Sequence, residues 1–257
     1  MRPSGLLLFG LSFLLTCLGH ARGAAAEPII VSGAASLINA MTEIKAGFEK
    51  THPQWEVFVN FAASGQLLQQ IEVGAPVDVF VPADQETMDR AQKAGFIDEA
   101  SRVDFTANDL LLVVPADTKD VSCLADLGGD KVSRVALGEP DAVPAGSYAR
   151  QTLTGAGLWD RLEPKLVYGL SVKQALDYVA LGEVDAAFVY ATDARLASRQ
   201  VRVVANMGGH APIIYPAALV KNCPRQDAAR AFLAYLQSAD GQAVMARHGF
   251  KEPKAAP

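Results

Sequence analysis

The chain has 257 residues, of which half are hydrophobic and a fifth are charged, as is typical of a soluble globular protein. This length allows one large domain or two smaller ones, each with a proper core. The formal net charge is −5. Binding of nucleic-acid phosphates normally requires a basic face, so we expect no nucleic-acid partner.

The N-terminus has the pattern of a secretory signal peptide. Arg2 precedes an apolar run over residues 6–15, and small residues follow up to Ala26. We predict a signal peptide over residues 1–26, cleaved near Ala26, and export to the periplasm. The apolar run is too short to span a bilayer. Cys17 leaves a lipoprotein as the alternative. Cleavage removes two arginines and no acidic residue, so the mature net charge is −7.

After this segment, short apolar strands alternate with segments of helical period. The strands predicted in the first unit cover residues 29–31, 57–61 and 77–81. Helices are predicted over residues 36–52, over a segment that contains Leu67, Leu68 and Ile71 and ends at Gly74, and over residues 84–94. In the first helix Leu37, Met41, Ile44 and Phe48 share one face. Strands that alternate with helices indicate a parallel sheet with helices on both faces.

The same alternation then begins again. Further strands are predicted over residues 110–114, 132–137, 165–168, 184–190, 201–205 and 213–220. Helices begin near Ala145 and Val172, and two more, over residues 225–237 and 241–248, close the chain. If the closing helices pack on the opening sheet, the second unit is an insertion in the first.

We therefore predict two α/β lobes, each with a mainly parallel sheet flanked by helices. Residues 27–107 with 214–257 form the first lobe, and residues 108–213 form the second. The chain crosses between them near residues 106–109 and 212–216. Because no low-complexity linker occurs there, short hinge strands are expected.

Enzyme motifs are absent from the sequence. His52, His210 and His248 have no spacing typical of metal ligands, and there is no nucleophile elbow or phosphate-binding glycine loop. The carboxylates Asp78, Asp185 and Asp193 lie near strand ends but form no pair spaced for acid–base catalysis, so we interpret them as structural. We predict that the protein is not an enzyme.

Four predicted helix starts and one tyrosine indicate a binding site and not a catalytic one. The starts lie at Ser36, Ser64, Ala145 and Val172, and the tyrosine is Tyr190 at the end of a strand. Each offers an uncharged hydrogen-bond donor, because the first turn of a helix has free N–H groups. Either serine taken alone is explained more simply as an N-cap. Helix starts at the carboxyl ends of strands, however, meet at the edge where α/β proteins bind ligands, and we predict an anion site there.

The motifs around these positions resemble those of the periplasmic molybdate-binding proteins of ABC importers. The matching segments are Ala34-Ala35-Ser36-Leu37, Phe61-Ala62-Ala63-Ser64, Gly74 to Phe80, Ala83-Asp84-Gln85, Gly138 to Ala149 and Val189 to Ala194. The similarity covers nearly the whole mature chain. Gly65 is a departure, because relatives often have a further serine there.

This resemblance implies a fold, a ligand and a set of contacts. The fold would be the type II-like, two-lobe periplasmic binding protein fold with its ligand in the cleft. The ligand would be molybdate or tungstate, held by the Ser36 and Ser64 hydroxyls, the Ala145 and Val172 backbone N–H groups and the Tyr190 hydroxyl. These groups contact the oxyanion's oxygens and not the metal, and no cofactor is implied. The partner would be the membrane permease of an ABC importer. A monomeric carrier would deliver the ligand to this permease after its lobes close on the ligand.

Several alternatives remain open at this stage. The protein could carry another tetrahedral oxyanion such as sulfate, or could process an oxyanion enzymatically on the same scaffold. A ferric-iron carrier is less favoured, because Tyr190 is the only strong iron ligand at the predicted edge. The sequence does not decide between molybdate and tungstate. It also does not decide whether Cys123 and Cys223 form a disulfide.

Overall fold

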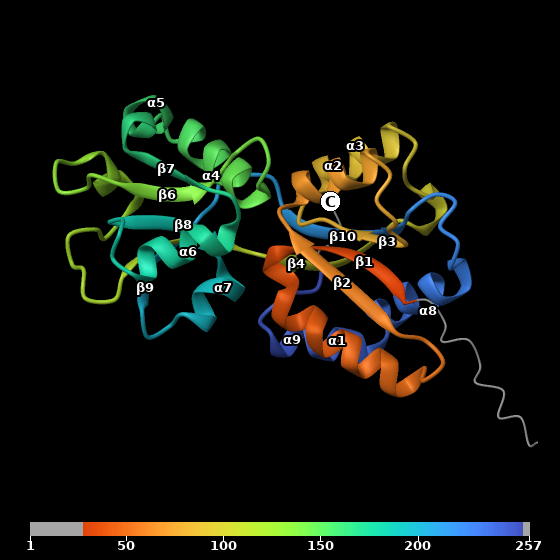
Figure 1. Ribbon diagram of the computed structural model, residues 1–257. Helices are drawn as coiled ribbons and strands as arrows, with labels where there is room; N and C mark the ends of the chain where they lie inside the picture. The colour runs from red at the N-terminus through yellow and green to blue at the C-terminus, as the bar shows by residue number, and fades with distance from the viewer. Residues whose placement is uncertain (1–27, 254–257) are drawn as a thin grey trace, which may run out of the picture.

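The computed structural model describes residues 28–253 of the chain. It has two lobes, each built on a five-stranded sheet (Figure 1). The predicted signal peptide lies outside the described residues. Among the described helices, none has both the length and the apolar character needed to cross a membrane.

The sheet of the first lobe has the strand order β2-β1-β3-β10-β4. Its strands are β1 (Ile29–Ala34), β2 (Val57–Ala62), β3 (Val79–Val81), β4 (Val103–Asn108) and β10 (Ile213–Leu219). Its helices are α1 (Ile38–Thr51), α2 (Ser64–Glu72), α3 (Gln85–Lys93), α8 (Gln226–Gln237) and α9 (Ala239–Arg247). Two 3-10 turns, η1 (Ala35–Leu37) and η2 (Glu99–Ser101), complete this lobe.

The sheet of the second lobe has the strand order β7-β6-β8-β5-β9. Its strands are β5 (Leu110–Pro115), β6 (Val135–Gly138), β7 (Leu166–Gly169), β8 (Ala186–Tyr190) and β9 (Val201–Asn206). Its helices are α4 (Pro144–Gly155), α5 (Trp159–Leu162), α6 (Val172–Ala180) and α7 (Ala191–Leu196). The 3-10 turns are η3 (Leu124–Gly128) and η4 (Glu163–Lys165).

In each sheet, one strand runs against the other four. β10 pairs antiparallel with β3 and β4, and β5 pairs antiparallel with β8 and β9, whereas the remaining pairings are parallel. β5 and β10 are the strands with which the chain enters the second lobe and re-enters the first. The predicted mainly parallel α/β sheets with flanking helices are confirmed.

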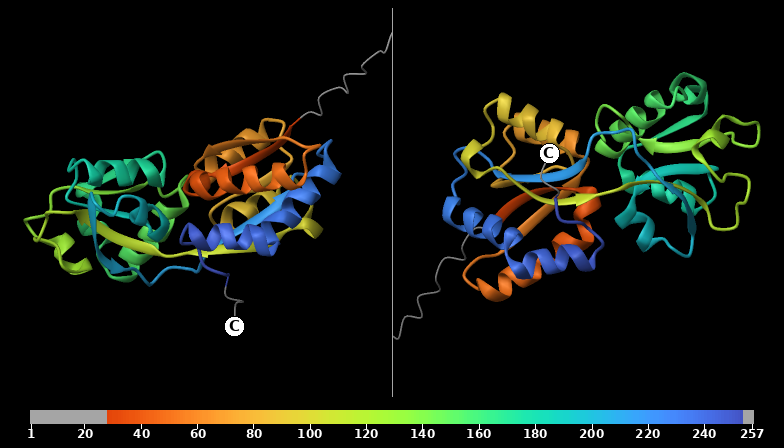
Figure 2. Two further views of the ribbon diagram at one scale, coloured as in Figure 1. Left: turned by 90° about the horizontal axis from the view of Figure 1, so that it is seen from below. Right: turned by 180° about the vertical axis from the view of Figure 1, so that it is seen from behind.

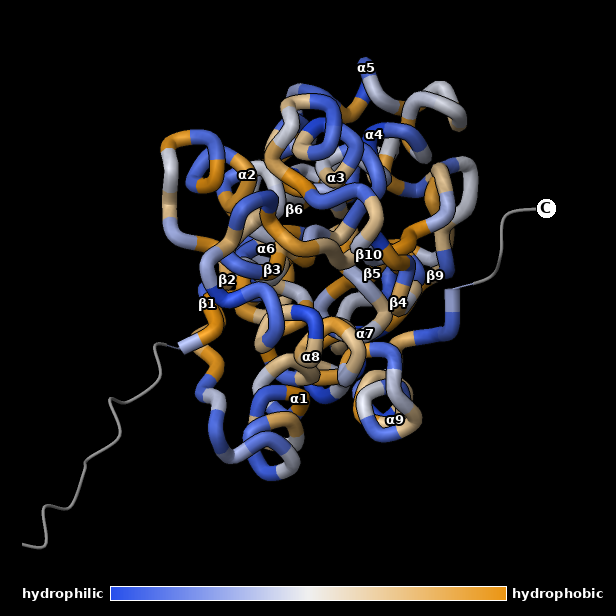
Figure 3. Tube along the Cα trace, turned by 90° about the vertical axis from the view of Figure 1, so that its right-hand side faces the viewer, coloured by the Kyte–Doolittle hydropathy of each residue, from blue (hydrophilic) through white to orange (hydrophobic). Residues whose placement is uncertain are grey.

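Hydrophobic burial follows the predicted spacing. Leu37 at the end of η1 and Met41, Ile44 and Phe48 in α1 are all completely buried, as their helical spacing requires. In the first lobe, α2 and α3 cover one face of the sheet and α1, α8 and α9 cover the other (Figure 1). Hydropathy along the trace shows strands dominated by hydrophobic residues and helices that carry both kinds (Figure 3).

Two chain segments join the lobes, as Figure 2 shows from two further directions. Asp109 lies between β4 and β5, and residues 207–212 connect β9 to β10. Pro216, which the sequence analysis placed in the second crossing, instead lies within β10. The C-terminal segment returns to the first crossing, where Lys251 and Ala107 exchange backbone hydrogen bonds of 2.8 and 2.9 Å.

Candidate functional site

The five predicted site residues line one small pocket between the lobes. Ser36 and Ser64 come from the first lobe, and Ala145, Val172 and Tyr190 come from the second. The remaining lining residues are small or apolar, apart from one serine: Ala34, Ala35, Ala62, Ala63, Ala83, Val143, Pro144 and Ser171. The pocket measures about 220 Å³, its mouth included, and none of these lining residues carries a formal charge. A small guest bound there would contact uncharged groups alone.

Three helices and one 3-10 turn begin at this pocket. Ser64 is the first residue of α2, Ala145 the second of α4 and Val172 the first of α6, while Ser36 lies in η1. Backbone N–H groups at such positions have no acceptor within their own helix. Pro144 supplies no N–H group, so Ala145 offers the first donor of α4. The helix dipoles add a positive potential at the same point.

The simpler explanation of the two serines as N-caps is wrong. The cap positions of η1 and α2 are Ala34 and Ala63, and neither has a capping side chain. Ser171, in contrast, is a true cap of α6, since its hydroxyl oxygen accepts a 3.2 Å bond from the N–H group of Gln174. The Ser36 and Ser64 hydroxyls are thus available for other partners.

Each of these two hydroxyls has one partner behind the pocket. The Ser36 hydroxyl lies 3.1 Å from the hydroxyl of Tyr215. The Ser64 oxygen accepts a 2.9 Å hydrogen bond from the backbone N–H group of Ala83. Because the Ser64 oxygen is the acceptor in this bond, the Ser64 proton remains available to a guest in the pocket.

Tyr190 places a buried hydroxyl at the pocket. The residue is 1% exposed, and its hydroxyl has no hydrogen-bond partner among the described residues. Burial raises the pKa of this phenol well above its usual value, with smaller contributions in the same direction from Tyr215 and Tyr148. Tyr190 therefore stays protonated and presents a donor. A buried donor without a partner is costly, which favours a polar guest beside it.

Glycines allow the backbone to approach closely around this site. A Cβ atom on Gly146 would lie 1.9 Å from the carbonyl oxygen of Gly138, so only glycine lets the start of α4 pack against the end of β6. The Val143-Pro144-Ala145-Gly146 motif thus positions the Ala145 N–H group through backbone packing.

The other acidic candidates have structural partners or lie outside the pocket. Asp78 is completely buried and accepts 2.7 Å bonds from Arg225 and from the N–H group of Ile30. Asp185 accepts bonds from the N–H groups of Ser133 and Arg134. None of these residues lines the pocket.

Asp193 is the exception among the carboxylates, since its oxygens have no hydrogen-bond partner among the described residues. It is 1% exposed, and the Lys173 ammonium group lies 3.8 Å away. Burial raises its pKa to about 7, while Lys173 acts in the opposite direction. Asp193 lies three residues after Tyr190 but does not line the pocket.

Within residues 28–253, the histidines and cysteines form no reactive group. His52 stacks on Phe48, His210 contacts backbone carbonyl oxygens, and His248 bonds to Glu43. In the described residues, no group of three or more His, Cys, Asp or Glu side chains has the arrangement of a metal site. Cys123 is exposed in the second lobe, Cys223 is buried in the first, and both are free thiols.

The sequence profile of the bacterial extracellular solute-binding proteins matches residues 29–251. The chain belongs to this family. It is 35% identical over 254 residues to the molybdate-binding protein ModA of Haemophilus influenzae, covering 96% of both chains. It is 38% identical over 229 residues to ModA of Escherichia coli, covering 86% of this chain and 88% of that one. The resemblance drawn from the motifs is confirmed.

A solved structure supports the fold of this solute-binding protein. The periplasmic molybdate-binding protein of Azotobacter vinelandii superposes with a TM-score of 0.79, covering 88% of this chain and 100% of that one. Because the sequence identity is 24%, this likeness shows the shared fold. The predicted two-lobe α/β binding-protein fold is confirmed.

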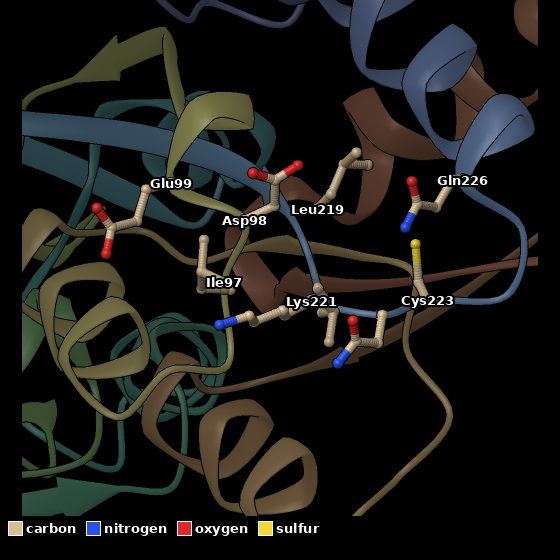
Figure 4. Close-up of a pocket in the computed structure, with 9 residues that line it drawn as sticks. Ile97, Asp98, Glu99, Leu219, Lys221, Cys223 and Gln226 are labelled. Atoms are coloured by element: carbon tan, nitrogen blue, oxygen red, sulfur yellow. The ribbon is translucent and has the colours of Figure 1, made fainter.

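A larger pocket of about 710 Å³, open solvent at its mouth included, lies in the first lobe away from these residues (Figure 4). Its lining includes the carboxylates Asp98 and Glu99 and a single cation, Lys221. The two carboxylates oppose an anion, so the pocket between the lobes is the better candidate site.

Two residues behind the pocket were missed by sequence reasoning. Tyr215 contacts Ser36, and Asn108 contacts Tyr215, each from a position in a strand of the first lobe. In the sequence, Tyr215 looks like an ordinary interior strand residue. The position of Asn108 at the predicted crossing between the lobes was the one feature of the sequence that could have pointed to it.

Proposed function

We propose that this protein captures molybdate or tungstate in the periplasm and delivers it to the permease of an ABC importer. One observation carries the proposal: five uncharged donors, from both lobes, line one small pocket. A fully deprotonated tetrahedral oxyanion has only acceptor oxygens, so a lining of donors complements it. The molybdate-binding relatives, which align over nearly the whole chain, support the same ligand.

The donors in the proposed site are the Ser36, Ser64 and Tyr190 hydroxyls and the Ala145 and Val172 N–H groups. Hydrogen bonds to a charged group contribute about 1.5–3 kcal/mol each. Micromolar affinity needs about −8 kcal/mol, which five such bonds supply even after part of the gain is lost to dehydration of the anion. No cation is needed.

Closure of the lobes is the proposed mechanism of use. An anion that contacts residues 27–107 and 214–257 on one side and 108–213 on the other stabilises the closed form through contacts that the open form lacks. The permease then recognises the closed protein. We propose a monomeric carrier without catalytic activity, exported by cleavage of residues 1–26.

Isothermal titration with molybdate, tungstate and sulfate tests this function. Molybdate and tungstate are nearly the same size, so we expect comparable affinities for them. Sulfate is smaller and meets donors set too far apart, so we expect its affinity to be much weaker. Equal affinity for sulfate would favour the alternative, a general carrier of tetrahedral oxyanions. Failure of both molybdate and tungstate to bind would contradict the proposal.

A further inference from the structure

A chain of buried hydrogen bonds runs from the hinge to the proposed oxyanion site. The side-chain amide of Asn108, at the end of β4, donates to the Tyr215 hydroxyl at 3.3 Å and to the Thr192 hydroxyl at 3.0 Å. The Tyr215 hydroxyl in turn lies 3.1 Å from the Ser36 hydroxyl. Tyr215 is completely buried, Asn108 is 6% exposed and Ser36 is 9% exposed. Water therefore has little access to this chain.

The chemistry of Asn108 sets the direction of the two bonds that its NH₂ group makes. Its amide oxygen accepts a 2.9 Å bond from the backbone N–H group of Asp109, so its NH₂ group faces Tyr215 and Thr192. An amide NH₂ group only donates, and the Tyr215 oxygen must accept from it. The Tyr215 hydroxyl keeps one proton, which the Ser36 oxygen 3.1 Å away can accept. Burial raises the pKa of Tyr215, so this proton is retained.

The outcome for Ser36 is the same as that for Ser64. With Tyr215 as the donor, one lone pair of Ser36 is used, just as the backbone N–H group of Ala83 uses one lone pair of Ser64. Both hydroxyl protons are thereby left to point into the pocket that the two serines line. The difference is that Ser64 depends on a backbone group, whereas Ser36 depends on two side chains.

We propose that Asn108 and Tyr215 are positioning residues and that Tyr215 donates to Ser36, which orients the Ser36 proton toward the oxyanion. This inference rests on the proposed function. Without Tyr215, the Ser36 hydroxyl can rotate, and its proton is no longer ordered toward the guest.

A double-mutant cycle on molybdate affinity tests the inference. Tyr215→Phe removes only the hydroxyl and should weaken molybdate binding about tenfold. In the Ser36→Ala background the same change should cost less than about twofold, because Tyr215 acts through Ser36. In the Ser64→Ala background it should still cost about tenfold. Tyr235→Phe, which removes a phenol hydroxyl outside the site, should leave the affinity unchanged.

The cycle separates this role from a general loss of structure, because a structural loss would cost as much affinity in the Ser36→Ala background. Equal costs of Tyr215→Phe with and without Ser36 would overturn the inference. If the wild-type protein binds neither molybdate nor tungstate, the proposed function fails as well. If Tyr215→Phe does not fold, Asn108→Ala is paired with Ser36→Ala in the same cycle, with the same expectation.

Discussion

The backbone N–H group of Gly65 donates a 3.1 Å hydrogen bond to the carbonyl oxygen of Ala142, and this bond joins the two lobes. Gly65 follows Ser64 in α2, while Ala142 precedes the start of α4. The lobes are therefore in contact beside the proposed site. A Cβ atom on Gly65 would lie 3.0 Å from the Ala142 oxygen and 3.1 Å from its Cα atom. Gly65, where relatives often have a serine, thus lies at the contact between the two lobes.

Gly65→Ala should weaken molybdate binding without destabilising the ligand-free protein. The added methyl group forces the closed lobes apart by a few tenths of an ångström, at the lower end of overpacking costs, about 1 kcal/mol. This corresponds to about a fivefold loss of affinity in isothermal titration. Gly155→Ala is the matched control, because a Cβ atom there would have only an ordinary contact of 3.9 Å. Equal affinities of the two variants would show that Gly65 does not limit closure.

Tyr190→Phe should weaken molybdate binding by about 10- to 100-fold, because the hydroxyl would donate to a charged acceptor. The melting temperature without ligand should not fall, since this hydroxyl has no partner among the described residues. Isothermal titration and thermal unfolding of the same preparation separate the two effects. If the affinity does not change, Tyr190 is not part of the binding site.

Asp193→Asn should make stability less dependent on pH. The carboxyl has a pKa of about 7 in the folded protein, raised by burial from its ordinary value of 3.8. Between about pH 4 and pH 7, the folded state therefore keeps a proton that the unfolded state has already released. The free energy of unfolding falls as the pH rises through that window, because burial of the charged carboxylate is unfavourable. The stability of the variant relative to wild type should increase from pH 4 to pH 7 and then level off. Urea unfolding at pH 5 and pH 8 measures this, and an identical difference at both values would refute it.

Asp78→Ala should be strongly destabilising, although Asp78 does not line the proposed anion site. It removes the buried carboxylate that accepts from the Arg225 guanidinium and from the Ile30 N–H group. Breaking such a pair costs about 3–5 kcal/mol. Denaturant unfolding should show this loss, while Asp120→Ala, which removes an exposed partner of Lys131, should change little. A small loss for Asp78→Ala would mean that the pair is compensated within the fold.

Most of the fold follows from local patterns in the sequence. The spacing of Met41, Ile44 and Phe48 indicated α1 because one helical face is buried, and the apolar run from Leu110 indicated β5 because that strand is covered on both faces. β4 was not predicted, although apolar and polar residues alternate along Val103–Asn108 as is typical of a strand at a sheet edge. The second crossing was predicted at residues 212–216, but Ile213–Leu219 is β10, and Pro216 is accommodated at a register shift within that strand.

The candidate site was predicted through helix starts and family motifs, and its five residues lie together in one pocket. The sequence does not indicate in which direction the Ser36 and Ser64 hydroxyl groups point. Ser36 and Tyr215 are 179 residues apart, and no local pattern relates a serine in η1 to a tyrosine in β10. The same holds for Ser64 and Ala83, where a backbone N–H group determines which way the hydroxyl points.

A crystal structure of the protein with tungstate tests the central claim most directly, because the heavy atom marks the anion without ambiguity. We expect the tungsten atom between the lobes, with the four oxygens within hydrogen-bond distance of the Ser36, Ser64 and Tyr190 hydroxyls and the Ala145 and Val172 N–H groups. Tungstate bound elsewhere, or held by a lysine or arginine side chain, would contradict the account.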